Sequence, residues 1–214
     1  MGGRIVSVLS VVILLVVAPV YATPIVTGQL TYVTTPPSSL AVGAFESATT
    51  FSLIQEVASV TLLSPTSAGA LGGAIPAGTA VTVYIIHADP IGSTTTLYSG
   101  DVTFDGPILG LLGLYAGSST LDAIDPGVIA LGSPVTTYPT GLTNRGLEVG
   151  PGLGDAFSLS NANQTLTMSF RTASDVDELR VFVATPIPEP ASALLLGVGL
   201  AALLGFRKLL PARR

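Results

Sequence analysis

The chain has 214 residues and a formal net charge of -5, with one histidine, no cysteine and no tryptophan. The lack of cysteine excludes thiol catalysis, thiolate zinc sites and disulfide-stapled scaffolds, and one histidine cannot build a histidine-rich metal site within one chain. All but one of the 13 acidic residues, but only three of the eight basic residues, lie between Thr23 and Ile187, where there is no lysine. Nucleic acid is excluded as a partner, because phosphate binding needs clustered Lys and Arg.

The first 22 residues have the features of a secretory signal peptide. Arg4 supplies the positive start, residues 5–17 are apolar, and Val20-Tyr21-Ala22 is a small-residue cleavage site. We predict cleavage between Ala22 and Thr23, so that the region from Thr23 onward is exported.

Three strands are expected in the first half of the exported region, at residues 26–33, 57–63 and 79–87. The third alternates most clearly. One side carries Val81, Val83, Ile85 and His87, and the other carries Thr82, Tyr84 and Ile86. Because large side chains stand on both sides, we expect this strand to be central in its sheet.

The second half continues the pattern of short strands and turns. Residues 100–110 predict strand, turn and strand, and the glycine- and proline-rich residues 116–155 predict a long functional loop or an irregular crossover. Three final strands are expected at residues 156–159, 166–170 and 179–183, the first two joined by a hairpin loop. Residues 23–184 are therefore predicted to form one all-β domain, an antiparallel β-sandwich of the jelly-roll-like or immunoglobulin-like kind.

His87 and Asp89 are two residues apart at the end of the clearest strand. A histidine oriented by a carboxylate is a general base for a serine nucleophile. However, the chain contains nothing like Gly-x-Ser-x-Gly. We favour the alternative, in which His87 makes a hydrogen bond at the strand end and Asp89 caps the following turn, and we expect no enzyme activity.

Carboxylates recur in close pairs along the chain. The weak calcium candidates are Asp101, Asp105, Asp175 and Asp177, and a further pair is Asp122 with Asp125. Calcium takes six to eight oxygen ligands, often from loop carboxylates and carbonyls. Asp is also an ordinary turn residue, and no pair has EF-hand spacing, so turn chemistry is favoured and no cofactor is assigned. A pair of carboxylates acting in glycoside hydrolysis would need a cleft that sequence does not show.

Two further sets of residues suggest interactions. Arg145 is predicted to pair with Glu148 in the long loop, and Arg171 and Arg180 with carboxylates at 175, 177 and 178 around the final hairpin. Tyrosines that share an exposed face would stack on carbohydrate; otherwise they pack the sheets. The candidates are Tyr32, Tyr84, Tyr98, Tyr115 and Tyr138.

The C-terminal residues 185–214 have three parts. Pro188-Glu189-Pro190 belongs to a proline-spaced segment that is held extended. Residues 191–206 are uncharged and apolar, which predicts a short membrane helix. The tail, residues 207–214, contains four basic residues that predict a cytoplasmic end: Arg207, Lys208, Arg213 and Arg214.

This order of Pro-Glu-Pro, apolar helix and basic end resembles the PEP-CTERM sorting signal of Gram-negative bacteria. The resemblance implies recognition by an exosortase, a membrane-embedded enzyme thought to cut near Pro188-Glu189-Pro190. It also implies transient anchoring in the inner membrane, followed by delivery to the cell surface or extracellular space. The mid-chain pieces 84–90, 102–110, 138–141, 145–148 and 177–181 also look similar to a β-rich extracellular domain of other such proteins, and this likeness implies no catalytic residue.

Three functions remain open from the sequence. The first, which we favour, is a non-enzymatic protein of the cell surface or extracellular matrix. The second is a carbohydrate-binding module acting on exopolysaccharide, using tyrosines and calcium. The third, least favoured, is a polysaccharide hydrolase.

Overall fold

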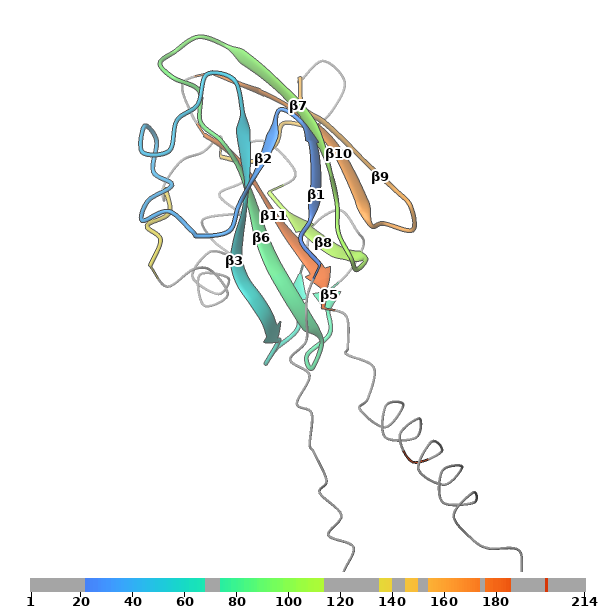
Figure 1. Cartoon of the computed structure of the whole chain (residues 1–214). Coiled ribbons are helices and arrows are strands. Elements are labelled where there is room, and N and C mark those ends of the chain that lie inside the picture. Colours follow the sequence, from blue (N-terminus) through green and yellow to red (C-terminus); the bar gives the residue numbers. More distant parts are fainter. Residues whose placement is uncertain are drawn as a thin grey trace, which may run out of the picture. The chain divides into compact units, whose positions relative to one another are not determined.

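The computed structural model describes residues 22–67, 74–113, 135–139, 145–149, 154–173, 176–185 and 199. Two sheets make up most of the domain (Figure 1). The four-stranded sheet has the order β1 (Ile25–Gly28), β7 (Thr96–Thr103), β10 (Thr165–Thr172) and β9 (Ala156–Ser160). The five-stranded sheet has the order β2 (Leu30–Val33), β3 (Phe51–Thr61), β6 (Ala80–Ala88), β11 (Asp177–Ala184) and β8 (Ile108–Leu112). A small hairpin pairs β4 (Thr66–Ser67) with β5 (Ala74–Ile75).

The all-β prediction is confirmed, and within the described residues no strand alternates with a helix. Residues Ala22–Ile187 form one compact unit. Among the residues that the structure describes, no helix has the length and apolar character needed to cross a membrane. The predicted membrane helix at 191–206 and the signal peptide up to residue 21 lie outside the described residues, apart from Gly199.

One strand pair departs from the expected antiparallel arrangement. The predicted first strand, residues 26–33, is two strands in different sheets, β1 and β2, separated by Gln29. The connection 34–50 returns the chain to the edge of the sheet at which β2 begins. Strand β3 starts from the same edge and therefore runs parallel to β2. All other neighbouring pairs are antiparallel.

A single apolar core lies between the two sheets. Inward-facing residues of the four-stranded sheet include Tyr98, Val102 and Phe170, and those of the five-stranded sheet include Phe51 and Ile86. The Phe51 ring lies 5.3 Å from the Phe170 ring and 5.9 Å from the Tyr98 ring. Aromatic pairs at such distances stabilise beyond their buried area by about 0.5–1.5 kcal/mol. The stacking of two sheets over this core is β-sandwich-like.

The outer face of the five-stranded sheet is buried as well. Val81, Val83 and Phe182 pack against Leu62, which precedes the small hairpin, and Ile75, which belongs to its strand β5. Beside them a second cluster joins the outer side of the sheet to loop residues, and it consists of Leu40, Ile54, Ile85 and Tyr138. Strand β6 is therefore covered on both faces and lies between β3 and β11, which confirms its predicted central position.

The remaining predicted elements agree with the structure to different degrees. The hairpin predicted between the final strands is present, with positive φ angles of 51°, 52° and 65° at Asn161, Ala162 and Asn163. The second strand was predicted at 57–63 but is Phe51–Thr61. Its first half carries Ser52, Gln55 and Glu56, polar residues that interrupt the apolar pattern and are satisfied only in the folded sheet. Most of 116–155 lies outside the described residues.

Candidate functional site

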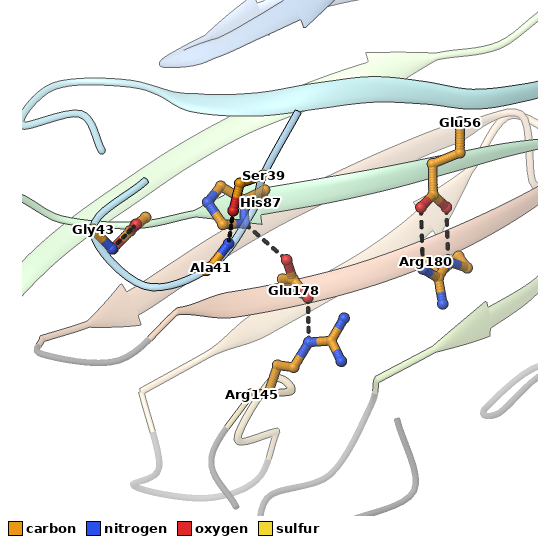
Figure 2. A network of polar contacts seen from close by, with 9 residues as sticks. Ser39, Ala41, Gly43, Glu56, His87, Arg145, Glu178 and Arg180 are labelled. Carbon is orange, nitrogen blue, oxygen red and sulfur yellow. Dashed lines mark hydrogen bonds and ion pairs between the residues drawn. The ribbon is translucent and has the colours of Figure 1, made fainter. Parts of the chain in front are cut away.

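The most concentrated group of charged side chains lies on the covered outer face of the five-stranded sheet. Strand register aligns Ser52 of β3, His87 of β6 and Glu178 of β11 in one row. The next outward row contains Arg180 of β11, beside Ile85 of β6. Figure 2 shows Glu178 between His87 and Arg145, and Arg180 facing Glu56.

Glu178 is the centre of the first group and is fully buried. His87 Nδ1 lies 2.9 Å from Glu178 Oε1, and Arg145 Nε donates to Glu178 Oε2. Because an ionised carboxylate only accepts hydrogen bonds, Nδ1 carries the proton of this contact. Burial by itself raises the pKa of Glu178, but the His87 hydrogen bond and the charges of Arg145 and His87 outweigh it and hold the pKa below its ordinary value of 4.5.

Arg180 and Glu56 form the second group. Arg180 Nε donates to Glu56 Oε2 at 2.7 Å, and a second guanidinium nitrogen donates to Oε1 at 3.1 Å. The guanidinium carbon lies 5.3 Å from the centre of the Tyr138 ring. This two-pronged geometry is the preferred one for a buried arginine and carboxylate. The structure thus pairs Arg145 with Glu178 and Arg180 with Glu56. The partners predicted from the sequence were Glu148 for Arg145, and the carboxylates at 175, 177 and 178 for Arg180.

His87 and Asp89 do not form a unit. The carboxylate that contacts the His87 ring belongs to Glu178, whereas Asp89 Oδ2 accepts a hydrogen bond from Gly43 N at 2.8 Å. The Asp89 carbonyl accepts another from Ser47 N at 2.9 Å. Burial raises the pKa of Asp89 despite the opposing Gly43 contact. Asp89 therefore fastens the 41–47 loop, which precedes it in the chain, and not the following turn that it was predicted from the sequence to cap.

The His87 ring is sealed from solvent, with 1% of the residue exposed. Its Nε2 atom has no hydrogen-bond partner among the residues that the structure describes, and the Phe45 ring lies 6.1 Å away. A general base must reach a substrate proton directly or through one water. This arrangement suits a structural clamp better than catalysis.

A second carboxylate cluster joins three parts of the chain. Glu148, Asp155 and Asp177 each offer one oxygen within 4.8 Å of the others, close enough to hold a cation. Both Asp155 oxygens already accept backbone hydrogen bonds at 2.7 Å, Oδ2 from Glu148 N and Oδ1 from Arg171 N. Burial raises the pKa of Asp155, while these two donors oppose the shift. The described contacts make Asp155 a loop clamp.

Among the residues that the structure describes, the calcium candidates Asp101, Asp105 and Asp177 do not form one cluster. Asp177 belongs to the cluster just described, and Asp175 lies outside the described residues. Asp101 Oδ2 accepts a hydrogen bond from Thr27 Oγ1 at 3.0 Å. Asp105 accepts one from the backbone N–H of Ala22 at 3.2 Å, which places Ala22 and Thr23 exposed beside the β7–β8 turn.

The predicted tyrosine platform is not formed by the described tyrosines. Tyr84, Tyr98 and Tyr138 are buried, and Tyr32 is half-buried with its hydroxyl donating to Gln55 at 2.6 Å. Burial raises the pKa of Tyr84 strongly. Tyr115 lies outside the described residues. These four rings serve sheet packing.

An open groove lies on the other side of the domain, on the outer face of the four-stranded sheet. Its volume is about 480 Å³. Outward-facing residues of β7, β10 and β9 line it: Ser99, Asp101, Thr167, Ser169, Ala156 and Ser158. Of these, sequence reasoning singled out only Asp101, because serines and threonines on a strand carry no signal of a site.

The described part of the chain is an all-β domain whose polar groups mostly clamp the structure. Residues 186–208 match the family model of the PEP-CTERM protein-sorting motif. The match includes Pro188, Glu189, Pro190, Arg207 and Lys208. It identifies the chain as a PEP-CTERM exosortase substrate, sorted by that membrane enzyme to the cell surface or extracellular space. No curated protein and no solved structure matches the chain.

Proposed function

We propose that the chain is a non-enzymatic protein of the cell surface or extracellular matrix, with residues 23–184 as its working domain. A signal peptide of residues 1–22 directs export, and the apolar residues 191–206 hold the chain briefly in the inner membrane. An exosortase then processes it at Pro188-Glu189-Pro190. The observation that carries the proposal is the sorting-motif match at residues 186–208.

The character of the described polar groups supports a non-catalytic role. Glu178, Arg145, Glu56 and Arg180 are all at least nine-tenths buried and occupied with one another. His87 is bound to the same group and sealed. A charged cluster without solvent access stabilises one arrangement of strands, whereas acid–base catalysis requires contact with a substrate.

Stability without disulfides also suits an exported domain of this design. The chain has no cysteine, and its five-stranded sheet is covered by apolar residues on both faces. Buried ion pairs then fix strand register, because a one-residue slip would leave an arginine or a carboxylate buried alone. The domain is held by its core and its buried pairs where other exported domains rely on disulfides.

The test is the mass and terminal sequence of the protein recovered from its native host, with medium and membrane fractions compared. We expect a released species that begins at Thr23 and ends near Pro188. A protein found only in membranes with Arg214 retained would contradict processing by an exosortase.

A further inference from the structure

The groove on the four-stranded sheet is built from three neighbouring rows of residues that run across the strands. The two outer rows are Ser99–Ser169–Ala156 and Asp101–Thr167–Ser158, aligned by strand register. Since side chains alternate along a strand, both rows point to the same, outer face. The rows are about 7 Å apart along the strands, and three strands spaced by about 4.8 Å make the strip roughly 10 Å long.

The floor of the groove is the backbone of the middle row. This row pairs Gly28 with Gly100, Gly100 with Met168, and Met168 with Phe157. Met168 is buried in the core and Phe157 packs against it. Neither glycine has room for a side chain, because a Cβ on Gly28 would lie 2.7 Å from Ser99 O and one on Gly100 2.6 Å from Thr27 O. The floor is therefore free of side chains, because Met168 and Phe157 are directed to the core and the two glycines have none.

The hydroxyl groups inside the groove differ from those beside it. One row further along, the hydroxyls of Thr103 and Thr165 bond to each other at 3.0 Å. Among the residues that the structure describes, the hydroxyls of Ser99, Thr167 and Ser158 make no hydrogen bond with one another or with any neighbour. A hydroxyl both donates and accepts, so these groups match a ligand that is itself rich in hydroxyls.

The charge of the groove and of the domain disfavours an anionic ligand. Asp101 is the one charged residue that lines the groove, and Thr27 occupies one of its carboxylate oxygens, which leaves Oδ1 to accept hydrogen bonds. Within the described ranges Arg171 is the one exposed basic residue, since Arg145 and Arg180 are buried. A polyanion would be repelled by this acidic domain.

We propose that this groove binds a neutral polysaccharide chain, laid across β7, β10 and β9, with the free hydroxyls and Asp101 as its hydrogen-bonding partners. The inference rests on the proposed function, because a protein delivered to the cell surface meets such polymers there. No exposed aromatic ring lines the groove, so each site binds weakly. Many copies on one surface would bind a repetitive polymer together through avidity.

The experiment uses the full chain, purified in a detergent without a sugar headgroup, and an array of neutral oligosaccharides with alginate as the anionic comparator. We expect binding to at least one neutral glycan and none to alginate. Thr167→Val should weaken the affinity about three- to tenfold, the effect of losing one hydrogen bond. Its matched control is Thr165→Val, two residues away on the same face of β10 and outside the groove, which should leave the affinity unchanged.

A groove-filling change, Ser169→Arg, should abolish binding while the circular dichroism spectrum stays that of the parent. Absence of binding to every neutral glycan, preference for alginate, capture of a protein partner instead of glycan, or equal effects of Thr167→Val and Thr165→Val would each overturn the proposal. If Thr167→Val fails to fold, Ser158→Ala replaces it. A chain that binds glycan but is never released from membranes would contradict the sorting proposal and leave the groove proposal standing.

Discussion

At the scale of single residues, the molecule depends on Glu178. Its carboxylate joins His87 of β6 to Arg145 of a loop remote in sequence, and all three residues are buried. Buried ion pairs add little net stability compared with apolar packing, but removing one partner strands the other charge in a medium that solvates it poorly. The stability of the fold should therefore depend strongly on each of these three residues.

We expect Glu178→Gln to lower the free energy of unfolding by about 3 kcal/mol, because it leaves the Arg145 charge without its buried counter-charge. Urea denaturation followed by circular dichroism measures the change. Glu46→Gln is the control, since Glu46 is exposed and should change stability by less than about 0.5 kcal/mol. Equal effects of the two substitutions would show that the Glu178 cluster is not a structural clamp.

The same residue should govern part of the acid sensitivity. The pKa of Glu178 is lowered in the folded state, so the unfolded chain takes up its proton first as the pH falls. Its contribution to stability is therefore present above its ordinary pKa of 4.5 and is lost as the pH falls below that value. The raised pKa values of Asp89 and Asp155 act in the opposite sense, favouring the folded state below 3.8 and losing that contribution as the pH rises through the raised values.

Urea denaturation at a series of pH values below 4.5 should show a shallower loss of stability for Glu178→Gln than for the parent. Parallel curves for the two proteins would mean that Glu178 takes up a proton equally readily in the folded and unfolded chains. Asp155→Asn should change the slope in the opposite direction, because it removes a group whose pKa is raised by burial.

At the scale of the elements, the passage of the chain from one sheet to the other is made at Gly28 and Gln29. Gly28 has a φ of 71°, and Gln29 N donates to Ser99 O at 2.9 Å. The Gln29 side chain joins β7 to the loop that leads into β3, since Ser99 N donates to its Oε1 and its Nε2 donates to Thr49 O. This corner places β1 against β7 and brings Gly28 into the lining of the groove.

Gly28→Ala should destabilise the domain by more than Gly92→Ala does. Both glycines have positive φ, 71° and 75°, so both changes cost about 1–2 kcal/mol of backbone strain. Only at Gly28 does the new Cβ meet backbone, 2.7 Å from Ser99 O, whereas Gly92 has nothing within 4 Å. The excess loss, about 1–3 kcal/mol, is measured by thermal or urea unfolding; equal losses would contradict the close approach of β1 to β7.

Elements with a strong local pattern were predictable from the sequence, and those fixed by distant contacts were not. The strands β6 and β10 could be predicted from their alternating residues, because burial on one face of a sheet has a period of two. The Asn-rich turn between β9 and β10 could be predicted from its turn-forming residues. The predicted start of β3 was six residues too late, and the missed first half contains the polar residues Gln55 and Glu56. Their partners, Arg180 and Tyr32, are supplied by other strands.

At the scale of the whole molecule, the chain combines a β-domain with a C-terminal sorting motif. The compact unit Ala22–Ile187 ends at the second residue of the sorting motif, which covers residues 186–208. We expect Glu189→Ala to block release into the medium, because it removes the charged residue of Pro188-Glu189-Pro190. The thermal unfolding of the β-domain should stay unchanged. Immunoblots of medium and membranes, with Glu46→Ala as control, measure release; release of Glu189→Ala at the parental level would contradict recognition at this motif.

The sequence by itself determined the properties that depend on local pattern and composition. These were the all-β class, the central position of β6, the exclusion of thiol chemistry, and the sorting motif, which is recognised as a linear segment. Only the tertiary structure decided which charges meet, because Glu178 and Arg145 or Arg180 and Glu56 are brought together by strand register and not by sequence spacing. The groove on the four-stranded sheet could likewise not be predicted from the sequence, since its rows form only when β7, β10 and β9 lie side by side in register.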